Sequence, residues 1–167
     1  MKAWLPKLKE KLEALAKIKG WKLDIKEILE LGGNNSMIVN GIHSITNVRF
    51  EEKVIEYGSK IYRGLFAQFE HVYSCKISND LFLKTDYKQF TNATRQLKEQ
   101  IRETPALAQK FSSKGLQDIM NEKDIIDGFT WHHNEAEGVL ELVEREIHRL
   151  TSHIGDRNIW GGGTKYR

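Results

Sequence analysis

Cysteine is almost absent from this 167-residue sequence, in which Cys75 is the only one. A lone thiol excludes an internal disulfide and excludes a zinc site built from several thiolates. The neighbouring Val72, Tyr73 and Ile77 are typical of a strand core. Cys75 is therefore expected to be a small buried hydrophobe rather than a catalytic thiol.

Long hydrophobic runs are also missing. The longest apolar runs extend over a few residues, whereas a membrane helix needs roughly 20, so no membrane-spanning segment is expected. Residues 1–7 lack both the long apolar stretch and the small-residue cleavage site of a signal peptide. Export would therefore require a larger precursor or a dedicated secretion machine.

The excess of positive charge is small. A net charge of +3 does not by itself indicate a nucleic-acid-binding protein. Its distribution is uneven, because residues 1–30 carry eight lysines against five acids. A second basic segment contributes Lys84, Lys88, Arg95, Lys98, Arg102 and Lys110. Both segments are suited to hold a polyanion without sequence preference, although two solvated helix faces would give the same pattern.

The remaining composition is that of an ordinary globular protein, with 40% apolar and 29% charged residues. The chain is long enough for one domain with a sizeable core and a small helical extension. Helical periodicity predicts helices over residues 3–18, 86–103 and 144–152. Two short helices are expected from capping signals: one between an N-cap at Asp24 and a stop at Gly32-Gly33, and one that begins after a cap at Ser113. Strand patterns occupy parts of 36–77, 128–131 and 139–143, and Gly161–Gly163 is expected to be flexible closing chain. This mixture predicts an α+β fold.

Histidine is concentrated at one place. Four of the six histidines lie in a 22-residue stretch, at positions 132, 133, 148 and 153. Imidazole both binds divalent metals and exchanges protons near neutral pH. The stretch is also acidic, which suits a cation. Four nitrogen ligands are enough for one metal site and one additional base.

The expected order of elements brings these histidines together. A strand ends in His132-His133, a second strand and a helix follow, and the resulting hairpin is crossed by the helix. His132, His148 and His153 then share one divalent cation, while His133 points the other way along the strand and acts as a general base. Because His148 and His153 are five residues apart, both can bind one ion only if the helix ends or bends near residues 151–152.

The neighbours of these histidines have simpler expected roles. Trp131 is expected to be a packing anchor. Glu141 is expected either to orient an imidazole or to form a solvent-facing ion pair. His43 and His71, in the strand-rich region, are expected to be ordinary residues.

The sequence resembles the DNase/tRNase domain of colicin-like bacteriocins, the WHH branch of the HNH and endonuclease VII superfamily. The resemblance covers roughly residues 55–163. It rests on Tyr57-Gly58-Ser59-Lys60-Ile61-Tyr62-Arg63-Gly64-Leu65-Phe66, Thr130-Trp131-His132-His133, Leu142-Val143, Ile147-His148-Arg149, His153-Ile154-Gly155 and Ile159-Trp160-Gly161-Gly162-Gly163.

The resemblance implies a His-Me finger (ββα-metal) nuclease core holding one divalent metal ion, Zn, Mg or similar. It implies His132, His148 and His153 as metal ligands and His133 as the general base, with His132 also part of the catalytic pair. Arg63 and Arg157 are the implied substrate contacts. The superfamily often has an asparagine where this chain has Val139, and Asn134 is expected to replace it as structural support.

The resemblance also implies a biological setting. The expected protein is the C-terminal toxin module of a bacterial competition system. It is delivered as part of a larger secreted toxin, acts in the target-cell cytoplasm, and is held in check by a cognate immunity protein. Residues 1–54 match no known pattern and are expected to be a helical or linker extension, with the nuclease domain at 55–167. No pattern indicates a homo-oligomer.

These observations favour a metal-dependent endonuclease acting on DNA. An RNase that cuts tRNA is the main alternative. A non-catalytic metal-binding or nucleic-acid-binding module would not need His133. A structural zinc domain would unfold, rather than only lose activity, when the metal is removed.

Overall fold

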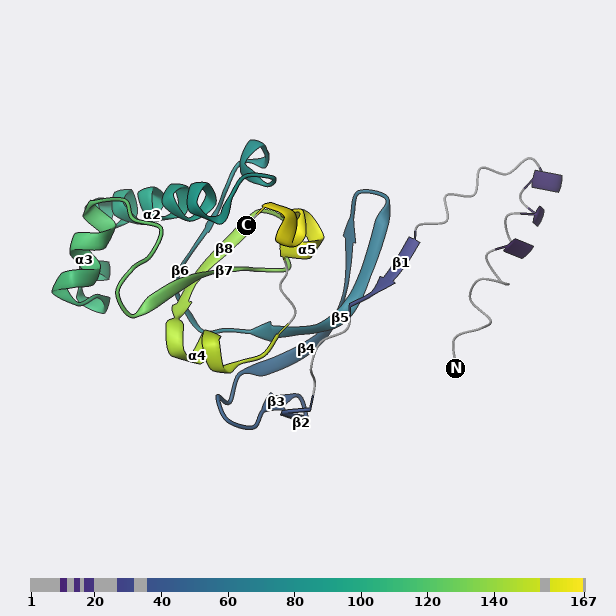
Figure 1. Cartoon of the computed structure of the whole chain (residues 1–167), viewed down its shortest axis with the longest axis horizontal. Coiled ribbons are helices and arrows are strands. Elements are labelled where there is room, and N and C mark those ends of the chain that lie inside the picture. Colours follow the sequence, from purple (N-terminus) through teal and green to yellow (C-terminus); the bar gives the residue numbers. More distant parts are fainter. Residues whose placement is uncertain are drawn as a thin grey trace.

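The computed structural model describes residues 10–11, 14–15, 17–19, 27–31, 36–153 and 157–166. Its elements confirm the expected α+β class (Figure 1). The first sheet has the order β1-β5-β4-β3-β2 and the second has the order β6-β8-β7. The strands are β1 (Glu27–Glu30), β2 (Ile38–Val39), β3 (Ile42–His43), β4 (Arg49–Tyr57), β5 (Lys60–Gln68), β6 (His71–Lys76), β7 (Phe129–His133) and β8 (Val139–Glu144).

The described helices are α2 (Asp86–Glu103), α3 (Ser113–Met120), α4 (Arg145–Leu150) and α5 (Arg157–Trp160), with 3₁₀ turns η1 (Asn79–Leu81), η2 (Pro105–Lys110) and η3 (Gly163–Tyr166). Helices α2 and α4 contact strands of the second sheet. Helix α2 has the bounds that its periodicity predicts. Its buried side includes Ala93, Leu97 and Ile101, as expected for a helix with one apolar face.

The long β4–β5 hairpin forms the centre of the first sheet. Tyr57 pairs with Lys60, so the connection is a two-residue turn, and Gly58 adopts a φ of +60° that favours glycine. The expected boundary between residues 54 and 55 lies inside β4, which pairs with β5 along its whole length. Residues 49–54 are therefore part of the same sheet as the strand that carries Arg63.

The second sheet carries the histidine pair. Strands β7 and β8 are antiparallel, with His132 opposite Glu141 and His133 opposite Leu140. Trp131 is 3% exposed, and its Nε1 donates to Thr94 Oγ1 at 3.0 Å. This buried hydrogen bond joins β7 to α2 and places the sheet against that helix (Figure 1).

Three local expectations were wrong. The helix expected from Asp24 is a strand over residues 27–30, because β1 pairs in parallel with β5 and this pairing outweighs a local capping signal. The cap of α3 is Ser112, whose Oγ accepts from Gly115 N at 3.0 Å, rather than Ser113. The closing glycines are not loose, because Gly161 and Gly163 are buried and η3 begins at Gly163.

Two other expectations concerned the N-terminal helix and membrane-spanning helices. Residues 10–11, 14–15 and 17–19 are helical, as expected, with Leu15 and Ile18 exposed; the rest of the predicted helix lies outside the described residues. Among the described helices, none combines the length and apolar character that crossing a bilayer requires.

Candidate metal centre

The pleat of β7 separates the two adjacent histidines. Successive side chains of a strand point to opposite faces, so His132 lies on the face toward α4, and His133 lies on the face toward α2. The contacts agree with this, because the His132 ring lies 5.3 Å from that of His148, whereas the His133 ring lies 5.3 Å from that of Phe90. His132 and His133 therefore belong to two different side-chain clusters.

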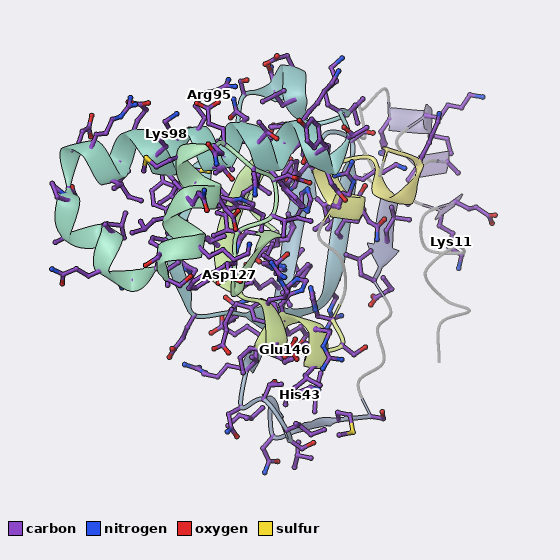
Figure 2. All side chains as sticks on the ribbon, turned by 60° about the vertical axis from the view of Figure 1, so that its left-hand side comes forward. Lys11, His43, Arg95, Lys98, Asp127 and Glu146 are labelled. Carbon is purple, nitrogen blue, oxygen red and sulfur yellow. The ribbon has the colours of Figure 1, made fainter. Side chains whose placement is uncertain are left out.

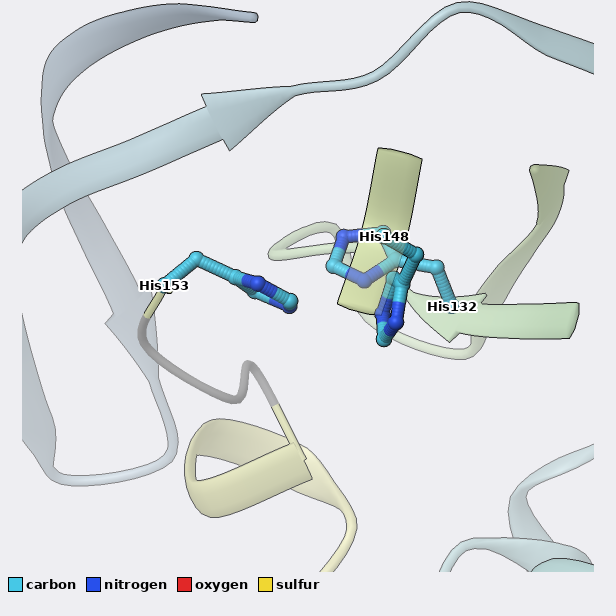
Figure 3. Close-up of side chains that lie close together, drawn as sticks. All are labelled: His132, His148 and His153. Carbon is cyan, nitrogen blue, oxygen red and sulfur yellow. The ribbon is translucent and has the colours of Figure 1, made fainter. Parts of the chain in front are cut away.

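The structure brings His132, His148 and His153 together (Figure 3). One ring nitrogen of each lies within 4.8 Å of the corresponding nitrogens of the others. The condition set by the five-residue spacing is met, since α4 ends at Leu150 and Thr151 is extended, with φ −91° and ψ 97°. The chain turns back after the helix and returns His153 toward His148.

Burial keeps these imidazoles neutral. It lowers the pKa of His148 to about 4, with a further contribution from nearby His153. Burial likewise lowers the pKa of His153 and holds that of His132 well below its ordinary value, with smaller contributions from the other histidines. A metal binds the neutral form of imidazole, so the cluster is ready for a cation near neutral pH.

Phe69 is the apolar wall of this cluster. Its ring lies 4.8 Å from His132, 5.3 Å from His148 and 5.1 Å from His153, and the residue is 6% exposed. An aromatic ring against all three imidazoles excludes water and favours their neutral form. Phe69 also lines a cleft whose other walls include Arg49 and Ile147.

The donor set fits a borderline-soft divalent ion better than magnesium. Imidazole nitrogens are ligands for zinc and related metals, whereas magnesium prefers oxygen ligands. Zinc–nitrogen bonds are roughly 2.0–2.1 Å long, so three nitrogens within 4.8 Å of one another need a small inward shift to share one ion. Three protein ligands also leave a fourth position for water or substrate.

A chain of hydrogen bonds from the turn after β3 supports His153, one of the three clustered histidines. His153 Nδ1 lies 2.7 Å from the carbonyl of Thr151, an acceptor, so Nδ1 carries the proton and Nε2 carries the lone pair. Thr151 Oγ1 lies 2.7 Å from Thr46 Oγ1, which lies 3.0 Å from His43 Nδ1. The turn after β3 thus supports the segment that carries His153.

His133 occupies a buried pocket on the other face of the sheet. The residue is 9% exposed, with Trp160 and Phe90 against its ring. Its Nε2 lies 2.7 Å from Gln89 Oε1 and 3.2 Å from Arg157 Nη1. Asp86 Oδ1 lies 3.8 Å from the same nitrogen. The described polar contacts of this ring thus include side chains of α2 and α5.

The described contacts of the acidic residues next to the histidines are to polar and basic side chains outside the three-histidine cluster. Glu141 is buried, accepts from Asn134 Nδ2 at 3.1 Å, and lies 3.6 Å from His71 Nδ1; burial raises its pKa. Glu135 forms an ion pair with Lys53. Asn134 also receives, at its backbone carbonyl, a 2.9 Å hydrogen bond from the Trp160 indole.

The two expected substrate contacts lie in very different surroundings. Arg63, on β5, has a half-exposed side chain that pairs with Glu52, and its described contacts do not include the three clustered histidines. Arg157 is 3% exposed and forms an ion pair with Asp86. Arg157 lies beside His133, but its guanidinium is enclosed by the protein.

The basic segment from 84 to 110 is partly neutralised within the structure. Arg95 and Lys98 both bind Glu122, each at 2.9 Å, and Arg102 pairs with Glu99. Figure 2 shows Arg95 and Lys98 on α2, at the opposite end of the molecule from His43.

Three important residues were not found from the sequence. Phe69 and Thr46 are distant from the histidines along the chain, and no spacing signal connects them. Gln89 did have a signal: it stands four residues before Ala93 on the apolar side of α2. A glutamine in a buried stripe needs specific hydrogen-bond partners.

Comparison with known families agrees with this arrangement. The family model for the DNase/tRNase domain of colicin-like bacteriocin matches residues 59–155, which includes all four clustered histidines. This is more than half of the chain, so the chain belongs to that family. Membership implies nuclease activity on a nucleic-acid substrate. Searches among curated proteins and among solved structures gave no match.

Proposed function

We propose that this chain is a metal-dependent endonuclease of the WHH type within the HNH and endonuclease VII superfamily, and that it hydrolyses DNA. The observation that carries the proposal is the convergence of His132, His148 and His153 within 4.8 Å, in a chain of the colicin nuclease family. The β7–β8–α4 order supports a ββα-metal core.

The residues divide the work between two faces of the β7–β8 hairpin. His132, His148 and His153 would hold one divalent ion, zinc or a similar metal, which when bound neutralises charge on the scissile phosphate and leaving oxygen. His133 acts as the general base, and its neutral imidazole accepts a proton from the attacking water. Trp131 keeps β7 in place through its hydrogen bond to Thr94.

Substrate binding depends on exposed positive charge. Arg63 is half exposed and remains the predicted phosphate contact, and Arg49, which lines the cleft next to Phe69, joins it in this proposal. Contacts of this kind release counterions, so nucleic-acid affinity should fall steeply as salt rises. A flat response between low and physiological ionic strength would argue against a polyanion substrate.

The biological setting follows from the family. The chain would be the toxin module of a larger secreted bacteriocin-like protein, active in the cytoplasm of the target cell and inhibited by a cognate immunity protein. A nuclease active in its own cytoplasm is lethal, so expression of the wild-type chain alone should arrest bacterial growth, and a His133→Ala chain should not.

The test compares two variants on plasmid DNA and on total RNA, with and without chelator. His133→Ala should keep zinc affinity and fold while losing roughly 10² to 10⁴ in cleavage rate. His132→Ala should lose metal affinity and activity together. Near wild-type cleavage by His133→Ala would refute the assigned base, and full activity in excess chelator would refute the metal.

The same assay decides between substrates. The family includes both DNases and tRNases, so cleavage of tRNA with intact plasmid would identify the RNase alternative. A structural zinc domain would instead unfold on chelation, which circular dichroism detects.

A further inference from the structure

Gln89 is a wholly buried amide whose orientation is determined by the backbone around it. It is 0% exposed, and its Nε2 donates to the carbonyls of Leu81 at 3.0 Å, Phe82 at 2.8 Å and Lys84 at 3.1 Å. Turning the amide over would set its oxygen against three carbonyl oxygens. The Gln89 carbonyl oxygen is therefore fixed, and it points at His133.

This fixed acceptor determines which nitrogen of His133 carries the proton. Gln89 Oε1 lies 2.7 Å from His133 Nε2, and an amide oxygen can only accept, so Nε2 must donate. In a neutral imidazole the lone pair is then on Nδ1. The ring thus presents Nδ1 as its basic nitrogen.

Arg157 exerts the opposite influence on the same atom. Its Nη1 lies 3.2 Å from His133 Nε2, and a guanidinium can only donate, so it would favour an unprotonated Nε2. The Gln89 contact is shorter, and Nη1 also binds the Asp86 carboxylate. Asp86 Oδ1 itself lies 3.8 Å from Nε2, and as an acceptor it adds a weaker preference for the same Nε2–H form. With the glutamine in place, the Nε2–H form of His133 is the favoured one.

We propose that Gln89 is a positioning residue for the hydrolysis, which selects the Nε2–H tautomer of His133 and thereby presents Nδ1 to the attacking water. The inference rests on the proposed function, since it assumes that His133 is the base. Gln89 itself touches neither metal nor substrate. In the other tautomer the proton is already on Nδ1, the nitrogen that should accept one from water. Hydrogen-bond partners of catalytic histidines commonly prevent this by fixing the tautomer.

Two substitutions separate this role from a structural one. Gln89→Met fills a similar volume without an acceptor. Arg157 Nη1, at 3.2 Å, then lies nearer to Nε2 than Asp86 Oδ1 does, at 3.8 Å, so the proton should move to Nδ1. Gln89→Glu keeps an oxygen facing His133 but loses the donors to three carbonyls, so it should lose stability yet retain the Nε2–H form. Gln96→Met is the matched control, because Gln96 is on the same helix and donates to a backbone carbonyl, that of Lys76, at 3.2 Å.

The readout is the ¹⁵N NMR spectrum of the His133 ring in the full chain loaded with zinc, which shows which nitrogen bears hydrogen. We expect Nε2–H in the wild type, in Gln89→Glu and in Gln96→Met, and Nδ1–H in Gln89→Met. The cleavage rate of Gln89→Met should fall about 10-fold to 10²-fold, less than when the base is removed, with zinc affinity unchanged. Gln89→Glu should recover most of that loss.

The possible failures are distinguishable. A wild-type ring with its proton on Nδ1, or a Gln89→Met ring that keeps Nε2–H, overturns the role of Gln89 even if the rate falls. If His133→Ala cuts at the wild-type rate, the proposed base is wrong whatever Gln89 does. Should Gln89→Met not fold, the wild-type and Gln89→Glu spectra still decide the tautomer.

Discussion

Replacing Arg157 by methionine should destabilise the protein strongly. Arg157 is 3% exposed, and the acceptors of its guanidinium include the Asp86 carboxylate, the Lys84 carbonyl at 2.9 Å and the Gly163 carbonyl at 3.0 Å. Hydrogen bonds that involve a charged group contribute about 1.5–3 kcal/mol each. Desolvation of the guanidinium offsets part of this, and the stranded Asp86 remains partly hydrated. The expected net loss is about 3 kcal/mol, at the lower end of the range for a broken buried ion pair.

Urea denaturation and thermal melting measure this loss. For a chain of this size, about 3 kcal/mol corresponds to a melting temperature roughly 6–12 °C lower. Arg149→Met is the matched control, because Arg149 pairs with Glu146 on the surface of α4, and exposed pairs contribute little; its midpoint should stay at the wild-type value. An Arg157→Met protein as stable as this control would refute the idea that Arg157 holds α5 against α2. Reduced DNA affinity at unchanged stability would instead favour the substrate-binding role predicted from the sequence.

Three further predictions concern the metal site, the thiol and acid stability. Thr46→Val removes the hydroxyl that contacts Thr151 and should weaken zinc affinity about 10-fold, the lower range for a residue that supports a ligand. Thr104→Val should leave zinc affinity unchanged, because the described hydrogen bond of the Thr104 hydroxyl is to Gln100 at the end of α2. Equal zinc titrations for the two variants would contradict the role of Thr46. Burial raises the pKa of Cys75 to about 12, so iodoacetamide at pH 8 should modify this thiol far more slowly in the native protein than in the urea-unfolded protein. Equal modification rates, followed by mass spectrometry, would contradict the burial of Cys75. The pKa of His148 falls from 6.5 to about 4 on folding, so the unfolded chain binds more protons than the folded chain between these values. The metal-free protein should therefore lose roughly 2–3 kcal/mol of unfolding free energy as pH drops through that window. Urea midpoints that do not change with pH would show that His148 is not buried.

Local sequence information was sufficient for the elements whose pattern is strong and whose partners are near in the chain. Helix α2 was predicted over its observed bounds, since an apolar stripe at helical spacing specifies both the helix and its buried side. The β7–β8 pair and the separation of His132 from His133 also follow from the sequence, because alternation along a strand is a property of the backbone. The need for the chain to bend after His148 followed from helix geometry alone, and α4 ends where that argument requires.

Tertiary structure decided what depends on contacts between distant segments. Residues 27–30 form a strand because β5 offers an unpaired edge, which no local pattern reveals. Arg157 was expected to bind substrate, but its position between α2 and η3 encloses it. Phe69 contacts His132 across 63 positions of the chain, and Gln89 contacts His133 across 44. Thr46 contacts Thr151, two residues before His153, across 105 positions. The sequence alone determined which chemistry the histidines can perform, and only the folded chain determined which side chains surround and orient them, because those side chains come from distant segments.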